Sequence, residues 1–416
     1  MSILHQIFKQ LNSKEFWPVW IGFSWFIIMI TIRIIFNTGP LDLKVWYYDT
    51  DFINQFSDLR LGISLIIITL FTVFTVSICH YFLKQNISYV SYSIIFLVVF
   101  LSKYFGTFSI LKNIGLGTSF WCIIIGCLLR FALHNYTDNL LNGIMSMEFF
   151  IKCGIVLFAI DIQEIAVLGG RGIVVGWVET ILLLTITFTI GIYIIRMSHV
   201  ETLLISSGLS ICGSSAIMAL SEIVNAESED INTSITILSV FTIPYISIMP
   251  IICKHYGFSD IFSGIWIGGT VDSTGAVIAS ASLLNKNALN SAIVLKMLQN
   301  IIIGPITLCI TGIWHNSVNP KILWHKFPKF IIGFFITSLT VSVLPNPSYR
   351  ENITNDCFIL SEWFSNISFV IIGLEIDLYG FKNIFQKKWK MIVLYIIGQN
   401  IDVFTTLGFD FLMFKN

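Results

Sequence analysis

Long hydrophobic segments separated by short polar connections make up most of this 416-residue chain. A transmembrane helix needs about 20 predominantly apolar residues, and fewer where the helix is short or broken. The candidates by this criterion are 16–36, 61–83, 89–105, 115–133, 148–160, 173–195, 201–221, 231–252, 258–284, 290–314, 329–344, 358–375 and 391–411. The pattern predicts an all-α polytopic membrane protein with about 11–13 transmembrane segments.

Two of these segments carry small and polar residues near their middle. One contains SGLSICGSSAIMAL at 207–220, and the other contains IGGTVDSTGAVIAS at 267–280. Unpaired backbone groups are costly inside a bilayer, so an unwound stretch persists only where it is buried or lines a cavity. Glycine permits unusual dihedral angles, and serine hydroxyls satisfy freed backbone groups. We expect two discontinuous helices that line a polar site; close helix packing through small residues is the alternative.

The interruptions supply candidate ligand groups. If a helix restarts near Ser214, its first amides point at the break with the positive end of the helix dipole, which favours an anion. The candidate substrate-binding residues of the two interruptions are Ser210, Cys212, Gly213, Ser214, Ser215, Gly269, Thr270, Ser273 and Thr274.

Two ionisable residues lie within predicted spans. Asp272 is near the middle of 258–284, and Lys296 is a few residues into the next span, with Asn300 one helical turn further along. An ionisable side chain at that depth is a functional candidate. We assign Lys296 and Asn300 to substrate binding and Asp272 to the coupling ion. The alternatives are a structural aspartate and a lysine that extends to the membrane surface.

Other charged residues rank lower as site candidates. We interpret four of them as polar contacts at helix ends or between helices: Glu179, Lys152, Asp161 and Asp402.

Composition supports the membrane class and limits the partners. The chain is 55% hydrophobic and 12% charged, whereas soluble domains have about 25% charged residues. Its net charge of zero argues against a general affinity for nucleic acid. The eight cysteines show no CxxC and no Cys/His spacing of a zinc site, so we expect neither a metal nor a cofactor.

Loop charges predict the orientation of the spans. Lysines cluster in 321–329 and again in 382–390, two spans later, so both loops are expected in the cytoplasm with the N-terminus. By the same count the acidic loop at 222–230 lies on the opposite side, and the two polar interruptions share one orientation. The weakly similar stretches 154–170 and 370–384 come out with opposite orientations, as an inverted repeat requires.

At these motifs the sequence resembles the YeiH-type family of multi-pass membrane proteins, whose inferred cargo is sulfate. The combination of CGSSA at 212–216 with the later Lys296-Met-Leu is the most specific part. The family pattern has a histidine followed by Val-Ala-Gln where this chain has Asp272 to Ala276. The matching stretches are GIVLFAIDIQEIAVLGGRG, SSGLSICGSSAIMAL, FSGIWIGGTVDSTGAVIASA, NSAIVLKMLQNIIIGPI and SNISFVIIGLEIDLYGFKNI.

The resemblance implies a plasma- or inner-membrane transporter built from inverted structural repeats. Its cargo would be sulfate or a related sulfur-containing anion. The opening SKEFWPVWIGFSWF is similar to longer members with extra N-terminal spans. We therefore expect extra transmembrane helices in 1–88 and a core transporter domain in 89–416.

The residues and the resemblance together predict a secondary active transporter of a small anion, with coupling to H⁺ or Na⁺. The expected partners are that anion, the coupling ion and the lipid bilayer, and a homo-oligomer is compatible with the sequence. One alternative is a cation/proton exchanger with Asp272 as the ion ligand. A more distant one is an intramembrane serine hydrolase that uses Ser210 with His255 as its base. We expect transport and no enzymatic activity.

Overall fold

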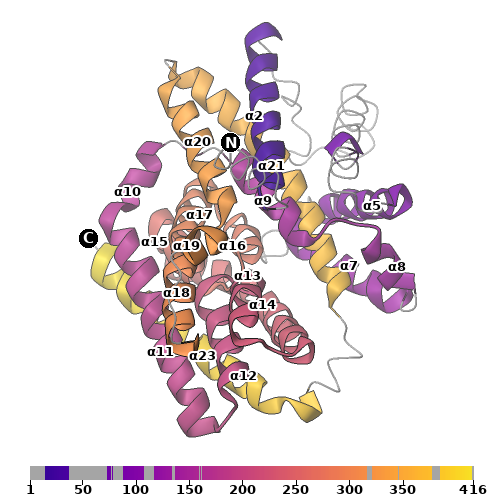
Figure 1. Cartoon of the computed structure of the whole chain (residues 1–416). Helices are drawn as coiled ribbons and strands as arrows, with labels where there is room; N and C mark the ends of the chain where they lie inside the picture. Colours follow the sequence, from indigo (N-terminus) through magenta and orange to yellow (C-terminus); the bar gives the residue numbers. More distant parts are fainter. Residues whose placement is uncertain are drawn as a thin grey trace, which may run out of the picture. The chain divides into compact units, whose positions relative to one another are not determined.

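The computed structural model describes residues 15–36, 73–75, 77, 88–106, 117–133, 136–158, 160, 162–315, 321–344, 346–376 and 385–414. These residues are largely helical and include no strand (Figure 1), which confirms the all-α class. Seven of their helices are long and apolar enough to cross a membrane: Trp17–Ile35, Tyr89–Gly106, Leu168–Ile195, Ser228–Tyr256, Lys286–His315, Ser348–Glu375 and Trp389–Phe414. The candidate segment 61–83 lies almost entirely outside the described residues.

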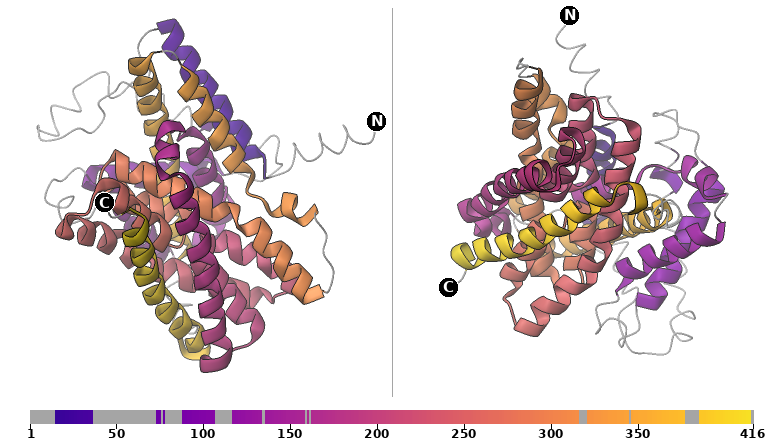
Figure 2. Two further views of the ribbon diagram at one scale, coloured as in Figure 1. Left: turned by 90° about the vertical axis from the view of Figure 1, so that its left-hand side faces the viewer. Right: turned by 90° about the horizontal axis from the view of Figure 1, so that it is seen from below.

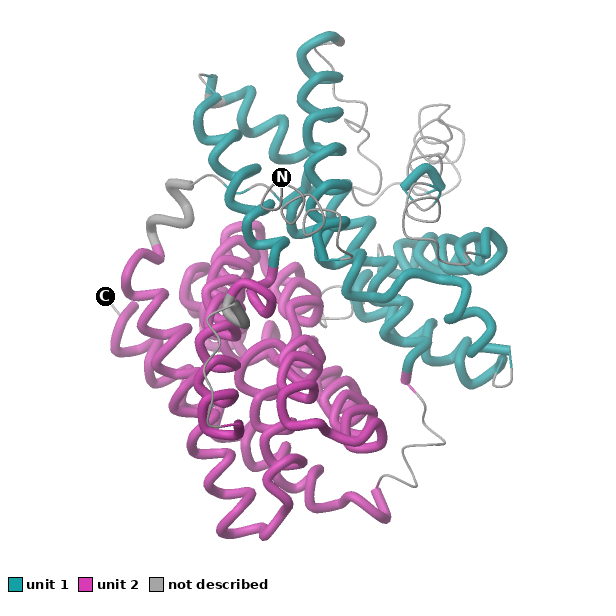
Figure 3. Tube along the Cα trace, viewed as in Figure 1, with its two compact units in different colours: residues 1–163, 329–375 teal, residues 164–328, 376–416 magenta. Residues whose placement is uncertain are grey.

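The chain divides into two compact units, coloured separately in Figure 3. Unit 1 comprises residues 1–163 and 329–375, and unit 2 comprises residues 164–328 and 376–416. The expected extra helices in 1–88 fall mostly outside the described residues, so the division at residue 88 stays a prediction.

Unit 1 is organised around its longest helix, α21, which packs against α7 and α9. Gly126 and Gly373 allow α7 and α21 to approach closely, because a Cβ at Gly373 would lie 2.2 Å from the Ile123 carbonyl oxygen. The helices of this unit are α2 (Trp17–Phe36), α5 (Tyr89–Gly106), α7 (Thr118–Leu133), α8 (Thr137–Asn142), α9 (Met147–Leu157), α20 (Lys329–Val343) and α21 (Pro347–Glu375).

Unit 2 contains both polar interruptions. Figure 2 shows α23, in yellow, alongside the magenta helix of residues 168–195, and the two are in contact. The elements are α10 (Ile162–Ile173), η2 (Val174–Glu179), α11 (Thr180–Thr189), η3 (Ile190–Ile195), α12 (His199–Ser207), η4 (Gly208–Cys212), α13 (Ser214–Val224), α14 (Ser228–Tyr256), α15 (Asp260–Thr270), α16 (Thr274–Ala281), α17 (Lys286–Ile301), α18 (Ile303–His315), α19 (Lys321–Lys326) and α23 (Trp389–Phe414); the η segments are π-helical.

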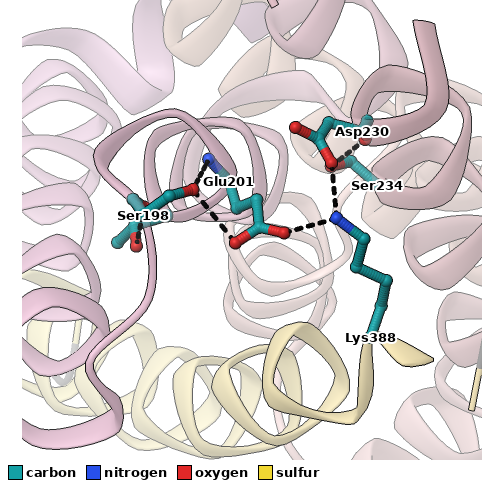
Figure 4. A network of polar contacts seen from close by, with 6 residues as sticks. Ser198, Glu201, Asp230, Ser234 and Lys388 are labelled. Carbon is teal, nitrogen blue, oxygen red and sulfur yellow. Dashed lines mark hydrogen bonds and ion pairs between the residues drawn. The ribbon is translucent and has the colours of Figure 1, made fainter. Parts of the chain in front are cut away.

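The first interruption reverses the direction of the chain. Helix α13 folds back along α12, and Leu203 of α12 shares an apolar cluster with Leu220 and Ile223 of α13. Lys388 donates to Glu201 in the first turn of α12 (2.6 Å) and to Asp230, just beyond α13 (2.8 Å; Figure 4). A crossing helix would separate these two carboxylates by roughly 30 Å. Residues 199–224 therefore form a re-entrant hairpin.

The second interruption also reverses the chain, from the other end of α14. Asp260 at the start of α15 accepts a hydrogen bond from Asn285, just beyond α16, at 2.7 Å. Residues 260–281 thus return to the end at which they entered. Asp230 and Tyr256 are near opposite ends of α14, so the two hairpins enter from opposite ends of this helix.

Two orientation predictions are wrong for the same reason. The acidic loop was placed opposite the lysine loops, yet Lys326 pairs with Glu222 and Lys388 pairs with Asp230. The count treats both 201–221 and 258–284 as crossings. The return of 258–284 reverses the predicted side of the lysine loops relative to the acidic loop, and the return of 201–221 reverses the predicted entry side of the second interruption. The two interruptions also have opposite orientations rather than one. Opposed hairpins are the arrangement that an inverted repeat produces, and the repeat itself stays a prediction.

A clasp of three residues, Lys388, Glu201 and Asp230, holds the two ends of the first hairpin together. Partial burial disfavours the ammonium, but the hydrogen bonds that it donates to Asp230 and Glu201 outweigh this effect and raise the pKa of Lys388 above the ordinary lysine value. Ser198 caps α12, because its hydroxyl accepts from the Glu201 amide (3.2 Å) and donates to the Glu201 carboxylate (3.0 Å). The clasp therefore stays charged at neutral pH and holds both ends of the first hairpin together.

The hairpins predict which positions share one side of the membrane. In a cysteine-free background, Ser198→Cys and Glu227→Cys flank the first hairpin, and both positions are exposed. A membrane-impermeant thiol reagent is expected to label these two variants from the same side. Lys286→Cys, beyond the second hairpin, is expected to be labelled from the other side. Labelling of positions 198 and 227 from opposite sides would show a crossing helix instead.

Candidate functional site

The tips of the two hairpins touch. Gly213 ends η4 with φ 65° and ψ −127°, a conformation that favours glycine. A Cβ at this position would lie 3.4 Å from the Cβ of Ser273. Helix α13 restarts at Ser214, as the sequence predicted, and Ser273 caps α16 by accepting from the Ala276 amide at 3.2 Å. The N-termini of α13 and α16 therefore begin at one contact.

The contact lies at mid-span. Thr242 is the central residue of α14, fourteen residues from Ser228 and fourteen from Tyr256. At 1.5 Å per residue, this places it roughly 21 Å from either end of the helix. Its hydroxyl donates to Asp272 Oδ2 at 2.8 Å, so the link between α15 and α16 is held at that depth.

Asp272 is 1% exposed and is held on one side only. Its Oδ2 accepts from Thr242 and from the hydroxyl of Tyr395 on α23. Its Oδ1 is buried and has no hydrogen-bond partner. The carboxyl group is thus oriented by two hydroxyls and keeps one free acceptor.

Lys296 is fully buried, so its side chain does not extend to the membrane surface. Its Nζ donates to Gln299 Oε1 at 3.0 Å. The amide nitrogen of Gln299 in turn donates to the Gly269 carbonyl (3.3 Å) and to Glu179 Oε2 (3.4 Å). Gln299 therefore connects the buried ammonium to the end of α15 and to an acid on a third helix.

The remaining predicted residues of the second interruption join the same network. Thr274 accepts from Asn300 Nδ2 at 3.3 Å, whereas Asn300 Oδ1 is buried without a partner. The Thr270 carbonyl accepts from Gln399 Nε2 at 2.8 Å. Gly269 is needed because a Cβ there would lie 2.5 Å from the methyl group of Thr406.

The residues of the first interruption fall into two groups. Ser214 and Ser215 begin α13 and are partly exposed beside the tip contact. Ser210 instead donates to the carbonyl of Ser206 in its own helix. Cys212 packs in an apolar cluster with Ala216 and the start of α18. Sequence reasoning thus placed Ser210 and Cys212 at the right break but did not reveal that they point into helix packing.

One face of α23 was missed. Its polar residues recur at intervals of four, three, four and four, and each is at most 1% exposed. This helical spacing was the available signal. The residues are Tyr395, Gln399, Asp402, Thr406 and Asp410.

Glu179 and Asp402 are interhelical contacts, as expected, but they lie at mid-span rather than at helix ends. Asp402 is thirteen residues from Trp389 and twelve from Phe414. Glu179 is near the middle of Leu168–Ile195, at the end of the π-helical segment η2. Such segments often occur at functional sites. Elsewhere, Lys152 pairs with Glu148 in α9, and Asp161 lies outside the described residues.

Comparison with known proteins identifies the family. The model of the family described as conserved hypothetical protein 698 matches residues 91–395, which include both hairpins and Lys296. The chain belongs to this family. The match confirms the YeiH-type resemblance, and the relatives of this family are named UPF0324 membrane proteins. With seven long apolar helices among its described residues, the protein is an integral multi-pass membrane protein.

Three relatives show the range of similarity. A UPF0324 membrane protein of Nitratidesulfovibrio vulgaris is 32% identical over 343 residues, which cover 77% of this chain and 58% of the relative. One of Rhodopirellula baltica is 32% identical over 347 residues (78% and 63%), and one of Lactiplantibacillus plantarum is 26% identical over 251 residues (57% and 71%). The alignment thus spans about three fifths of the first two relatives' length. No solved structure matches the chain.

The tip contact predicts a sharp glycine requirement. Gly213→Ala is expected to destabilise the protein by about 2 kcal/mol, because a side chain is strained at this backbone conformation. Gly408→Ala is the matched control, since Gly408 is in α23 with nothing within 4 Å of its added Cβ. Thermal unfolding in detergent measures both. Equal stability of the two variants would contradict the observed conformation of the tip.

Proposed function

We propose that the protein is a secondary active transporter of a small anion, coupled to H⁺ or Na⁺, with sulfate or a related sulfur-containing anion as cargo. The observation that supports this most directly is the meeting of two helix N-termini at mid-span, close to a buried lysine. Opposed re-entrant hairpins with binding groups at their tips suit a carrier that opens alternately to each side.

The groups at the tips match the chemistry of an oxyanion. The positive dipole ends of α13 and α16 favour negative charge. Hydroxyls of Ser214, Ser215 and Thr274 stand at these helix starts, and all three residues are partly exposed. An anion such as sulfate offers several acceptor oxygens to such donors. Lys296 would supply the balancing charge from behind the tips.

Asp272 is the coupling group in this proposal. It directly precedes Ser273, the cap of α16, so a change in its charge acts on the same helix start that would hold the anion. Its free Oδ1 can take a proton or contribute one ligand to a monovalent cation. Each hairpin enters from one end of α14, so movement of either tip would open the contact toward one side only.

Sulfate flux tests both assignments. In proteoliposomes under an imposed pH gradient, the wild type is expected to accumulate radiolabelled sulfate. Asp272→Asn is expected to lower gradient-driven uptake about 10-fold or more, because an amide side chain cannot take up and release a proton. Lys296→Ala is expected to lose uptake, because the buried countercharge is gone. Glu227→Gln and Lys254→Gln alter exposed charges and serve as matched controls.

Normal sulfate uptake by Lys296→Ala would remove the anion role of this lysine. Absence of uptake by the wild type would remove sulfate as the cargo, and a screen of other anions and of Na⁺ would follow.

The excess of buried acids favours a second candidate, a cation/proton exchanger. Among the described residues of unit 2, four carboxyl groups and one lysine are buried: Glu179, Asp272, Asp402, Asp410 and Lys296. In the same liposomes, proton movement driven by a Na⁺ gradient without sulfate would support the exchanger. The hydrolase alternative lacks support, since the hydroxyl of Ser210 donates to a backbone carbonyl and His255 is exposed near the end of α14.

A further inference from the structure

The polar face of α23 leads from the hairpin tips to a second acidic group. Tyr395 contacts Asp272, and Gln399 contacts the Thr270 carbonyl. One turn further, Asp402 Oδ1 accepts from the Thr406 hydroxyl at 2.9 Å. The face therefore continues past the proposed anion site to Asp402.

Asp402 faces an acid on a neighbouring helix. Glu179 ends η2, which is in contact with α23, and its carboxyl group interacts with that of Asp402. Gln299 donates to Glu179 Oε2, and Thr406 donates to Asp402 Oδ1. The other two oxygens, Glu179 Oε1 and Asp402 Oδ2, are buried and have no donor. Two buried acceptors on interacting carboxyl groups are destabilising in an apolar interior when neither has a donor.

The charge balance of the cluster points the same way. Glu179, Asp402 and Asp272 together with Lys296 would carry a net charge of −2 if all four were ionised. Each uncompensated ion in a protein interior costs several kcal/mol. One proton held between two carboxyl groups removes one negative charge and supplies the missing donor at the same time.

We propose that Glu179 and Asp402 hold one exchangeable proton between their carboxyl groups, and that this pair is a second proton-coupling site of the transporter, beside Asp272. The shared proton is a property of the pair alone, whereas its coupling role rests on the proposed anion transport. The pair takes one proton from water, which changes its charge from −2 to −1, and returns it to water in the reverse step.

A proton fits this position better than a metal ion. In each carboxyl group one oxygen already accepts a hydrogen bond, so that oxygen is not available as a metal ligand. The described residues also contain no group of three or more His, Cys, Asp or Glu side chains arranged to hold a metal. The other titratable groups that interact with the pair or with Lys296 come from η4, α14, the α15–α16 link and α23: Cys212, Tyr245, Asp272 and Asp410.

Gln299 gives the pair a route to the anion site. Its side chain contacts Lys296 at one end and Glu179 at the other. When the pair carries −2, it neutralises Lys296 more completely and leaves less positive charge for an anion. When the pair holds its proton, Lys296 attracts the anion more strongly. The proton and the anion are then expected to bind cooperatively, and by linkage each raises the affinity for the other.

Infrared spectroscopy of the full chain in lipid tests the shared proton without any cargo. The wild type is expected to show the carbonyl stretch of a protonated carboxyl group that both Glu179→Gln and Asp402→Asn remove. Either amide donates an N–H to the remaining carboxylate and so replaces the proton. Asp272→Asn, a matched change in a buried acid, is expected to retain this component. A component that persists in Glu179→Gln would overturn the shared proton.

Equilibrium binding of radiolabelled sulfate across pH tests the coupling. Wild-type affinity is expected to fall by about 5-fold or more as the pair loses its proton, and Glu179→Gln is expected to flatten this dependence. An unchanged pH dependence in Glu179→Gln would overturn the coupling role. If the wild type binds no sulfate while both substitutions still remove the infrared component, the proposed cargo fails and the shared proton is supported.

Discussion

Backbone groups freed at a chain reversal inside a membrane must find polar partners, and unit 2 is organised around this constraint. Where α15 ends, the carbonyls of Gly269 and Thr270 accept from Gln299 and Gln399. Where α16 begins, Ser273 caps the helix. Two long helices, α17 and α23, must therefore present polar side chains at mid-span. The same requirement places amides and hydroxyls where a ligand can use them.

The ionisable groups follow from this arrangement. Gln299 satisfies the Gly269 carbonyl and also orients Lys296 and Glu179. Structure and proposed chemistry thus share one side chain, so a change in charge at either end is transmitted to the hairpin tip. The free oxygens of Asp272, Glu179 and Asp402 are the part of the network that backbone satisfaction does not explain.

In unit 1, buried charged residues with a structural role are paired with an opposite charge. Arg33 makes two hydrogen bonds to Asp356, at 2.9 and 3.0 Å, between α2 and α21. Lys103 pairs with Glu362 at 3.0 Å and lies 4.8 Å from the ring centroid of Trp363. These charges are matched one to one by an opposite charge. Unit 2 has more buried acids than bases, which is why we place the exchangeable charge there.

The sequence by itself determined the features that depend on neighbouring residues. Apolar segment length established the helical membrane class, and small polar residues marked both breaks, including the restart at Ser214. Asp272 and Lys296 stood out because charge is rare in apolar segments. Only the tertiary structure decided that the chain reverses at each break, that Gly213 meets Ser273, and that Tyr395 and Asp402 complete the cluster. A break has the same local composition whether the chain continues or returns. Its direction depends on contacts such as Lys388 with Glu201, 187 residues apart, which no local pattern encodes.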